Sequence, residues 1–340
     1  MDIPGYSIDF EKIVKTIKKE KYKRVVLQLP EGLKTYASQI VEFLENNTKA
    51  TIIVSADPCF GACDITNYEL KNFDVDLIIQ IGHVSIPDVE NLCIATLFVN
   101  AKSDINISNA VKKALPFLKE KGKKIGLVST SQHVHTLKKV EKILIENSFQ
   151  PFIGEGDSRI SLKGQILGCN FSAALSIAKQ VDLFLYLGSG NFHPLGLMLS
   201  TKKPVIAIDP YTIEIREKEL EELKDLILRQ RYGAIASSKD AKKFGILVSM
   251  KRGQQRINLA YKIKQMLDSK NKKSYIITAE NFSYSILEGF RDIDCFISTA
   301  CPRIAIDDYL QYKKPIITPI ELEIVLDKRK WEDYRFDQIL

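Results

Sequence analysis

Two absences limit what this chain can be. It has no uninterrupted apolar run of about 18 residues, the length that a membrane span needs. Its opening residues, MDIPGYSIDFEK, lack the basic and then apolar layout of a secretory signal peptide. We therefore expect a cytoplasmic protein without a membrane partner.

Cysteine is scarce as well. The 340-residue chain contains six cysteines, which is too few for a disulfide scaffold. We therefore expect reduced thiols that are either buried or bound to a metal. Cys93 and Cys295 lie beside or inside apolar runs, which predicts that both are buried and chemically inert.

The charge pattern does not indicate nucleic-acid binding. The formal net charge is +7, and Lys-rich clusters occupy residues 18–24 and 119–124. Basic blocks interleaved with aromatic residues, which are typical of nucleic-acid surfaces, are absent. We interpret the clusters as solvated helix ends and loops, and we expect no direct contact with nucleic acid.

One phrase occurs three times. Residues 75–83 are VDLIIQIGH, residues 181–190 are VDLFLYLGSG, and residues 293–301 are IDCFISTAC. Recurrence at a period of roughly a hundred residues predicts three pseudo-repeated copies of one supersecondary unit. The expected domains are 1–103, 104–211 and 212–340.

Each third of the chain alternates short apolar runs with amphipathic segments of helix length, which is typical of an α/β fold with mostly parallel sheets flanked by helices. The charged segment 214–231 is predicted to be a solvated helix without chemistry. The predicted strands are 24–29, 51–55, 77–81, 94–99, 125–129, 151–154, 183–187, 205–208, 245–249, 274–278, 294–298 and 315–318.

Each predicted domain has one cysteine at an expected strand-to-helix turn: Cys63, Cys169 and Cys301. Asn170 and Ser172 are expected helix caps, and Pro302 suits a first helical position. Domains arranged around a centre would bring the three thiols together, and soft thiolates select iron–sulfur clusters or zinc. A cubane cluster with three cysteine ligands keeps one iron open to a substrate.

Several short motifs follow or adjoin the predicted strands: PEGL (30–33), FGACD (60–64), GH (82–83), LGCNFS (167–172), LGSGNFHPLG (187–196) and STACPRIAIDD (298–308). Together they resemble the diphthamide-synthesis 3-amino-3-carboxypropyltransferase family of archaea and eukaryotes, whose members are radical S-adenosylmethionine enzymes. The resemblance covers nearly the whole chain. It implies three Rossmann-like domains around a central 4Fe–4S cluster held by Cys63, Cys169 and Cys301, and a homodimer in archaea.

The same resemblance implies the reaction. Members carry out the first step of diphthamide biosynthesis, the transfer of the 3-amino-3-carboxypropyl group of S-adenosylmethionine to a histidine of translation elongation factor 2. An external electron donor is required. The CxxxCxxC run of ordinary radical enzymes is absent here, which agrees with this family. One departure is Cys59, an extra thiol that we interpret as a neighbour of the ligand Cys63.

The loops after the strands are the expected contacts of S-adenosylmethionine, because ligands bind at the carboxyl ends of parallel strands. Arg303 and Asp307 are expected either to orient the cluster loop or to meet the protein substrate, or to form an ion pair with each other. Residues 249–256 are expected to form a solvated loop, with contact to the cofactor or to the elongation factor as the alternative. The candidate contacts are Pro30, Glu31, Gly32, Gly188, Ser189, Gly190, Phe192 and His193, with Gly82 and His83 as second choices.

Two other classes of protein remain compatible with the residues. One is a quinolinate-synthase-like dehydratase, in which the open iron acts as a Lewis acid on a small acid. The other is a non-catalytic binding protein or partner subunit with structural zinc. Cleavage of S-adenosylmethionine separates the first class from the transferase, and metal analysis separates the second.

Overall fold

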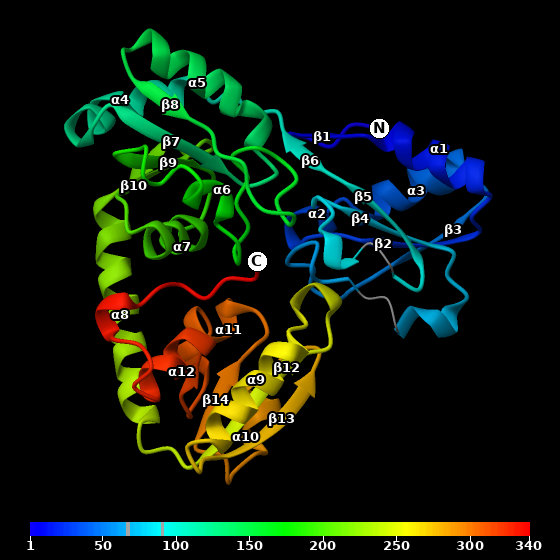
Figure 1. Cartoon of the computed structure of the whole chain (residues 1–340). Helices are drawn as coiled ribbons and strands as arrows, with labels where there is room; N and C mark the ends of the chain where they lie inside the picture. The colour runs from blue at the N-terminus through cyan, green and yellow to red at the C-terminus, as the bar shows by residue number, and fades with distance from the viewer. Residues whose placement is uncertain (66–68, 90–91) are drawn as a thin grey trace. The chain divides into compact units, whose positions relative to one another are not determined.

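The computed structural model describes residues 1–65, 69–89 and 92–340 (Figure 1). Its first parallel sheet has the strand order β3-β2-β4-β5. A short antiparallel ribbon pairs β1 (Tyr6–Ile8) with β6 (Ala101–Ser103). The other elements here are β2 (Arg24–Gln28), β3 (Thr51–Val54), β4 (Leu77–Ile81), β5 (Ala95–Val99), α1 (Phe10–Glu20), α2 (Glu31–Lys34), α3 (Ala37–Asn47), and the 3₁₀ helices η1 (Glu69–Phe73) and η2 (Pro87–Val89).

The second sheet has the order β11-β10-β9-β7-β8. Strand β7 pairs in parallel with both β8 and β9. The elements are β7 (Lys124–Ser129), β8 (Gln150–Phe152), β9 (Leu183–Leu187), β10 (Val205–Asp209), β11 (Glu214–Arg216), α4 (Ser108–Lys121), η3 (Val134–Thr136), α5 (Leu137–Glu146), α6 (Ser172–Leu175) and α7 (Phe192–Thr201).

The third sheet is parallel and has the order β13-β12-β14-β15. The elements are β12 (Lys243–Ser249), β13 (Lys273–Ala279), β14 (Cys295–Ser298), β15 (Ile316–Ile317), α8 (Lys218–Ser238), η4 (Arg252–Gln254), α9 (Ile257–Asp268), α10 (Tyr284–Glu288), α11 (Pro302–Ile306), η5 (Tyr309–Gln311), α12 (Pro319–Val325) and η6 (Trp331–Asp333).

Burial on both faces explains the continuous apolar strands. In β2, Val25 and Leu27 pack in one cluster with side chains of α1 and α3, whereas Val26 belongs to a separate cluster on the other face. Helix α1 contributes Phe10, Ile13 and Ile17, whose spacing of three and four residues places them on one side. The predicted mostly parallel α/β architecture is therefore confirmed.

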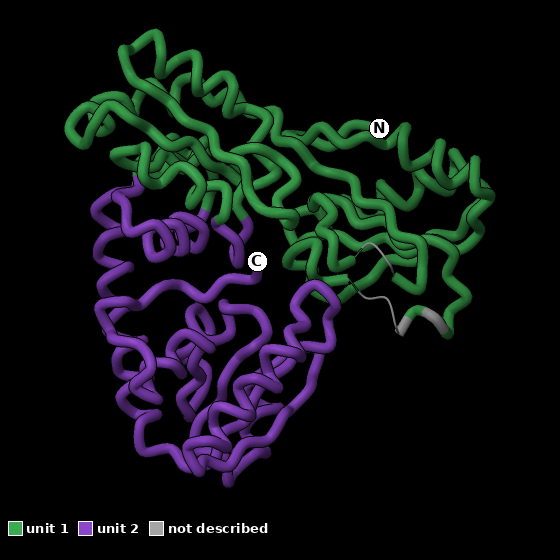
Figure 2. The backbone as a smooth tube through the Cα atoms, viewed as in Figure 1, with its two compact units in different colours: residues 1–166, 172–189, 206–215 green, residues 167–171, 190–205, 216–340 purple. Residues whose placement is uncertain are grey.

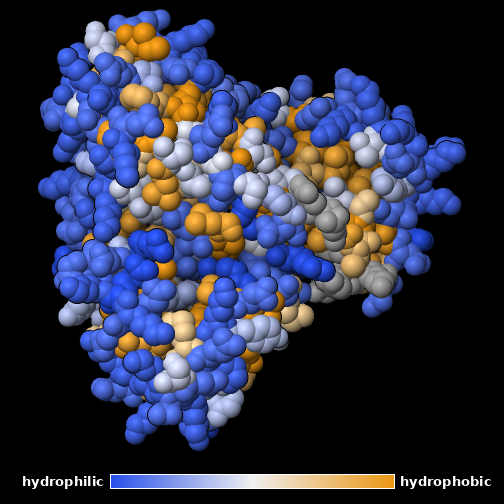
Figure 3. Space-filling model, in the orientation of Figure 1, coloured by the Kyte–Doolittle hydropathy of each residue, from blue (hydrophilic) through white to orange (hydrophobic). Residues whose placement is uncertain are grey.

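Contacts divide the chain into two compact units (Figure 2). Unit 1 comprises residues 1–166, 172–189 and 206–215, and unit 2 comprises residues 167–171, 190–205 and 216–340. Hydrophilic residues cover most of the face shown in Figure 3. Among the described residues, no helix has the length and apolar character needed to cross a membrane.

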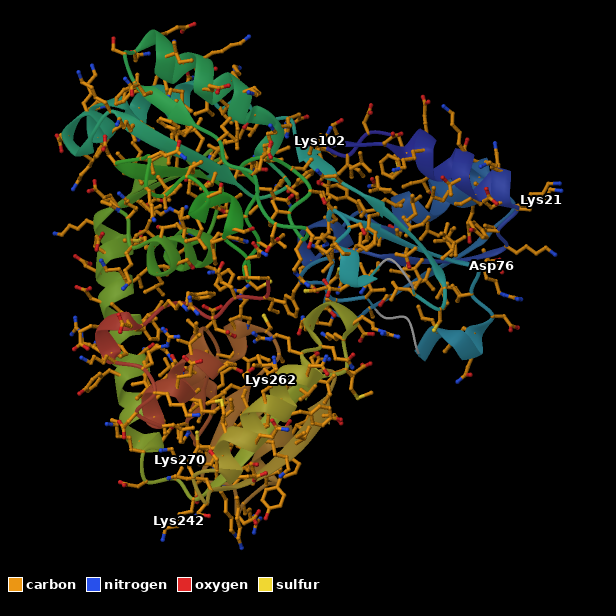
Figure 4. The ribbon with its side chains drawn as sticks, viewed as in Figure 1. Lys21, Asp76, Lys102, Lys242, Lys262 and Lys270 are labelled. Carbon is orange, nitrogen blue, oxygen red and sulfur yellow. The ribbon has the colours of Figure 1, made fainter. Side chains whose placement is uncertain are left out.

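The same aspartate arrangement occurs in all three sheets. The carboxylate of Asp76 accepts hydrogen bonds from the backbone N–H groups of Lys23 and Arg24, at 2.7 and 2.9 Å. Asp182 accepts from Lys123 and Lys124, and Asp294 accepts from Lys242 and Lys243. Asp76 and Lys242 are labelled in Figure 4. Each aspartate comes from the recurring phrase and satisfies donors at the start of a neighbouring strand.

One expectation about the fold is correct only in part. The segment 214–231 is expected to be a charged helix with a solvated face, and α8 forms most of it, but Glu214 begins the strand β11 and α8 starts at Lys218. Arg231 in α8 is fully buried and forms an ion pair with Glu321 at 2.6 Å. Its charge is tolerated because Glu321 and the carbonyl oxygen of Ile316 accept its hydrogen bonds.

Candidate cluster and cofactor site

Cys301 lies at the start of a helix in unit 2, as the sequence predicts. It is the N-cap of α11, and Pro302 is the first helical residue. The preceding loop is fixed at Thr299, whose backbone N–H and hydroxyl both donate to the carbonyl oxygen of Leu247, at 2.9 and 2.8 Å. The thiol of Cys301 is only partly buried, so it is accessible to a ligand.

Cys169 lies in a tight turn of unit 2. Backbone hydrogen bonds of 2.9 and 3.2 Å between Leu167 and Asn170 close the turn, and Cys169 is 9% exposed. The expected strand-to-helix context is only partly correct, because no regular strand precedes the turn and Gln165 forms just an isolated bridge with Ser129. Ser172 is the first residue of the short α6 rather than the residue before it.

Cys63 lies in a turn of unit 1. The N–H of Asp64 donates to the carbonyl oxygen of Gly61 at 3.0 Å, and the buried Gln28 side chain donates to the carbonyl oxygen of Asp64 at 2.9 Å. Gln80 from β4 approaches the same carbonyl at 3.4 Å. The next described helix is the 3₁₀ helix η1, and residues 66–68 before it are outside the described part.

The other cysteines have separate environments. The Sγ atom of the buried Cys59 lies 3.8 Å from Nδ1 of His83, so Cys59 is a neighbour of the predicted cofactor loop. Cys295 is buried as predicted, and burial raises its pKa to about 12. Cys93 is exposed, so the prediction of a buried thiol is wrong there. Its side chain lies just before β5, outside the apolar packing that its neighbours suggest.

In unit 1, two predicted cofactor loops are adjacent. Pro30 is the N-cap of α2, and a Cβ atom on Gly82 would lie 3.0 Å from the Cγ atom of Pro30. Gly82 also has a φ of +103°, which side chains with a Cβ rarely adopt. Glycine is therefore required at this position for both packing and backbone conformation.

The remaining unit 1 candidates lie in helix α2 or directly after a strand. Gly32 is exposed in α2, and Glu31 pairs with Lys34 at 2.6 Å. Gly188 and Ser189 directly follow β9. Burial lowers the pKa of His83 to about 4, so its imidazole is neutral at pH 7.

In unit 2, Phe192 links the two cysteine loops. The Arg303 guanidinium carbon lies 3.7 Å from the centre of the Phe192 ring. On another side, a Cβ atom on Gly168 would lie 2.2 Å from Phe192 Cε1. Gly168 precedes Cys169 and Arg303 follows Cys301 by two positions, so the aromatic ring packs between the neighbours of both thiols.

Of the roles expected for Arg303, the ion pair with Asp307 is present in the structure. The Nε atom of Arg303 lies 2.6 Å from the carboxylate of Asp307.

His193 and Gly190 are the remaining candidates of unit 2. Burial, followed by the charge of Arg303, lowers the pKa of His193 to about 4. Gly190 has an exposed position with a φ of +70°, and α7 begins two residues later.

The sequence reasoning missed Arg256. The segment 249–256 was expected to be a solvated loop, yet the side chain of Arg256 is mostly buried and pairs with Asp337. Nothing in the local pattern identifies this contact, because the partner lies near the other end of unit 2 in the sequence.

The three thiols fit an iron–sulfur cluster chemically, because thiolates are the usual ligands of such clusters. Cys63 and Cys301 are partly buried, whereas Cys169, at 9% exposed, and Cys295 are buried. Cys63 belongs to unit 1, and Cys169 and Cys301 belong to unit 2. Within either unit, the described residues do not bring three His, Cys, Asp or Glu side chains together as a metal site.

Comparison with known proteins agrees with the motifs. The family model "Putative diphthamide synthesis protein" matches residues 29–335. The 2-(3-amino-3-carboxypropyl)histidine synthase of Pyrococcus horikoshii is 39% identical over 337 residues, covering 98% of this chain and 94% of that protein. The enzyme of the same name from Methanocaldococcus jannaschii is 32% identical, with 98% and 93% covered.

Solved structures of Dph2 are also similar to this chain. The crystal structure of Dph2 from Pyrococcus horikoshii matches with a TM-score of 0.89 and 38% identity, covering 98% of this chain and 94% of that one. The structure of that Dph2 with a 4Fe–4S cluster matches with a TM-score of 0.88. The chain belongs to the diphthamide synthesis protein family.

Proposed function

We propose that this protein is a 2-(3-amino-3-carboxypropyl)histidine synthase that performs the first step of diphthamide biosynthesis. It transfers the 3-amino-3-carboxypropyl group of S-adenosylmethionine to a histidine of translation elongation factor 2, with methylthioadenosine as the other product. The observation that carries this proposal is the match over 98% of the chain to an enzyme of this name at 39% identity. A dehydratase or a zinc-binding partner subunit has no comparable support.

We propose Cys63, Cys169 and Cys301 as the ligands of a 4Fe–4S cluster. A cluster with three protein ligands supplies one electron and an iron that is open to the sulfonium compound. The partial exposure of Cys63 and Cys301 and the cluster in the related Dph2 structure support this assignment. The reaction is then a radical transfer that depends on an external electron donor.

The loops at the strand ends are proposed to hold S-adenosylmethionine. The absence of a Cβ atom on Gly82 lets its loop pack against Pro30, which brings the two loops together, and the neutral His83 beside them does not repel a sulfonium cation. The remaining proposed contacts are Glu31, Gly32, Gly188, Ser189, Gly190, Phe192 and His193. Since one face of Phe192 packs on Arg303, only its other surfaces remain for a cofactor.

The finer architecture is also a proposal. Three pseudo-repeated Rossmann-like domains, 1–103, 104–211 and 212–340, are supported by the shared order of the first four strands in each sheet. The aspartates in the three recurring phrases support the same division. By resemblance to archaeal members, the protein would act as a cytoplasmic homodimer.

Anaerobic reconstitution tests the function. Wild type, Cys63→Ala, Cys169→Ala and Cys301→Ala are incubated with elongation factor 2, reductant and labelled S-adenosylmethionine. We expect labelled factor and methylthioadenosine with wild type, and a loss of at least about 100-fold in each variant, because a cluster ligand is removed. Cys93→Ala is the matched control, since Cys93 is an exposed thiol outside the proposed set.

The product and the metal distinguish the alternatives. Intact S-adenosylmethionine with reduced, iron-loaded wild type would contradict the transferase and favour the dehydratase. Zinc without iron or sulfide in anaerobic preparations would contradict both enzymes. Activity that survives in one of the three cysteine variants would remove that residue from the ligand set.

A further inference from the structure

Arg256 holds the loop before Cys301. This arginine precedes α9, and its Nε and Nη2 atoms donate to the carbonyl oxygens of Thr299 and Ala300, at 2.7 and 3.0 Å. These are the two residues directly before Cys301. A planar guanidinium that bonds two successive carbonyls fixes the direction of the backbone there, which a flexible ammonium group would do less well.

The same guanidinium holds the C-terminal strap, defined here as residues 337–339. Its Nη2 atom lies 2.6 Å from the carboxylate of Asp337, and its Nη1 atom donates to the carbonyl oxygen of Gln338 at 3.3 Å. The side chains of Arg256 and Asp337 are 13% and 6% exposed. Because the pair is shielded from water, its charge-assisted hydrogen bonds are stronger than those of an exposed pair.

The C-terminal strap in turn holds the turn that carries Cys169. The N–H of Ile339 donates to the carbonyl oxygen of Cys169 itself at 2.8 Å. The side chain of Asn170 donates to the carbonyl oxygen of Ile339 at 3.0 Å, and the N–H of Phe171 donates to the side chain of Gln338 at 2.8 Å. Three consecutive residues of the turn are therefore bonded to the C-terminal strap.

These contacts form one continuous connection inside unit 2, from the loop of Cys301 through Arg256 and the C-terminal strap to the turn of Cys169. We propose that Arg256 and the C-terminal strap are positioning elements that set the backbone of both cysteines for cluster binding. This inference rests on the proposed function, which supplies the cluster. Arg256 is not itself a proposed ligand of the cluster or of the cofactor, and it acts only through the two loops.

The first test uses the metal-free protein, so it does not depend on the reaction. The alkylation rates of Cys63, Cys169 and Cys301 by iodoacetamide are measured by mass spectrometry in wild type, Arg256→Ala, Arg256→Lys and a chain ending at Phe336. We expect Arg256→Ala and the shortened chain to react about tenfold faster at Cys169 and Cys301. Cys63, in unit 1, should keep its wild-type rate, and Arg256→Lys should recover part of the protection.

Arg329→Ala is the matched control. Arg329 also forms a partly buried ion pair in unit 2, but its carboxylate partner is Glu323 and it donates to the backbone carbonyl oxygen of Asp333 rather than to a cysteine loop. If Arg329→Ala accelerates both thiols as much as Arg256→Ala does, the effect is general destabilisation and the proposal is wrong. Unchanged rates in both Arg256→Ala and the shortened chain would also overturn it.

The second test uses the reconstituted protein. Iron and sulfide per chain, and the electron paramagnetic resonance spectrum of the reduced cluster, are compared for the same variants. We expect about tenfold weaker retention of iron in Arg256→Ala, with partial rescue in Arg256→Lys. A wild type that binds the cluster but leaves S-adenosylmethionine intact would refute the proposed function alone, whereas wild-type retention and spectrum in Arg256→Ala would refute the positioning role alone.

Discussion

The loop of Cys63 and the loops of Cys169 and Cys301 are stabilised by different chemistry. In unit 1, neutral amide side chains of Gln28 and Gln80 reach the backbone beside Cys63. In unit 2, a shielded arginine–carboxylate pair, Arg256 with Asp337, connects the other two loops.

The difference predicts how each region responds to change. A neutral hydrogen bond contributes about 0.5–1.5 kcal/mol and is insensitive to pH and salt. A shielded ion pair costs much more to break, because removal of one partner leaves a buried charge without compensation. Substitution of one partner of a buried ion pair in unit 2 should therefore cost more unfolding free energy than substitution of a neutral amide side chain in unit 1. This cost does not mean that the ion pair stabilises the fold more than apolar residues of the same shape would.

The largest expected effect is at the second buried pair of unit 2. Glu321→Ala removes the carboxylate that accepts from two nitrogens of Arg231, whose side chain is fully buried. We expect unit 2 to lose about 3–5 kcal/mol of unfolding free energy. Urea unfolding followed by circular dichroism measures this loss.

The exposed ion pair of Lys15 and Glu11 in α1 provides the control. Glu11→Ala should change the free energy of unfolding by less than about 0.5 kcal/mol, because exposed pairs at this spacing contribute little. Equal losses of unfolding free energy in Glu321→Ala and Glu11→Ala would show that buried and exposed ion pairs contribute alike, which would contradict the expected difference between the two units.

A smaller effect is expected in unit 1. Gln28→Ala removes the donor to the carbonyl oxygen of Asp64, and Gln28 itself is 1% exposed. We expect a loss of about 1–3 kcal/mol that is the same at low and high salt. Alkylation should accelerate at Cys63 but not at Cys169 or Cys301, which mirrors the result expected for Arg256→Ala.

Gln132→Ala is the matched control for this variant, since Gln132 is a glutamine of unit 1 that contacts Tyr211 rather than the Cys63 turn. A Cys63 rate that stays at the wild-type value in Gln28→Ala would show that the turn is held by its backbone alone. Side-chain hydrogen bonds would then position cysteine loops in unit 2 only.

The sequence predicts most strands of the three main sheets, because parallel strands are buried on both faces. The apolar run 183–187 coincides with β9, and the run 77–81 coincides with β4. The first position of α11 followed from Pro302, whose fixed φ suits a helix start. These features depend on local residues, which a sequence displays directly.

The strands, hydrogen bonds and side-chain exposure that the sequence does not predict depend on contacts between residues far apart in the chain. The ribbon of β1 and β6 joins two three-residue strands from opposite ends of the first expected domain, and neither is a continuous apolar run. The bonds of Arg256 depend on a partner more than eighty positions away. Cys93 was expected to be buried because its neighbours are apolar, but an adjacent apolar sequence does not fix which residues the fold encloses.

The smallest expected effect compares one histidine from each unit. The pKa of His83 is lowered to about 4 by burial alone, whereas that of His193 is lowered to about 4 by burial and then by the charge of Arg303. Arg303→Gln should therefore raise the pKa of His193 by up to about one unit and leave that of His83 unchanged. Titration of the histidine ring protons by nuclear magnetic resonance measures both.

The same variant changes the pH dependence of stability in a defined direction. Since the folded pKa of His193 lies below 6.5, its contribution is fully present above that pH and is lost as the pH falls toward about 4. With Arg303→Gln this loss should shrink by up to about 1.4 kcal/mol, because one pKa unit corresponds to that amount. If His83 and His193 shift together, the two regions share one electrostatic environment, and the contrast between a neutral loop and a charged one fails.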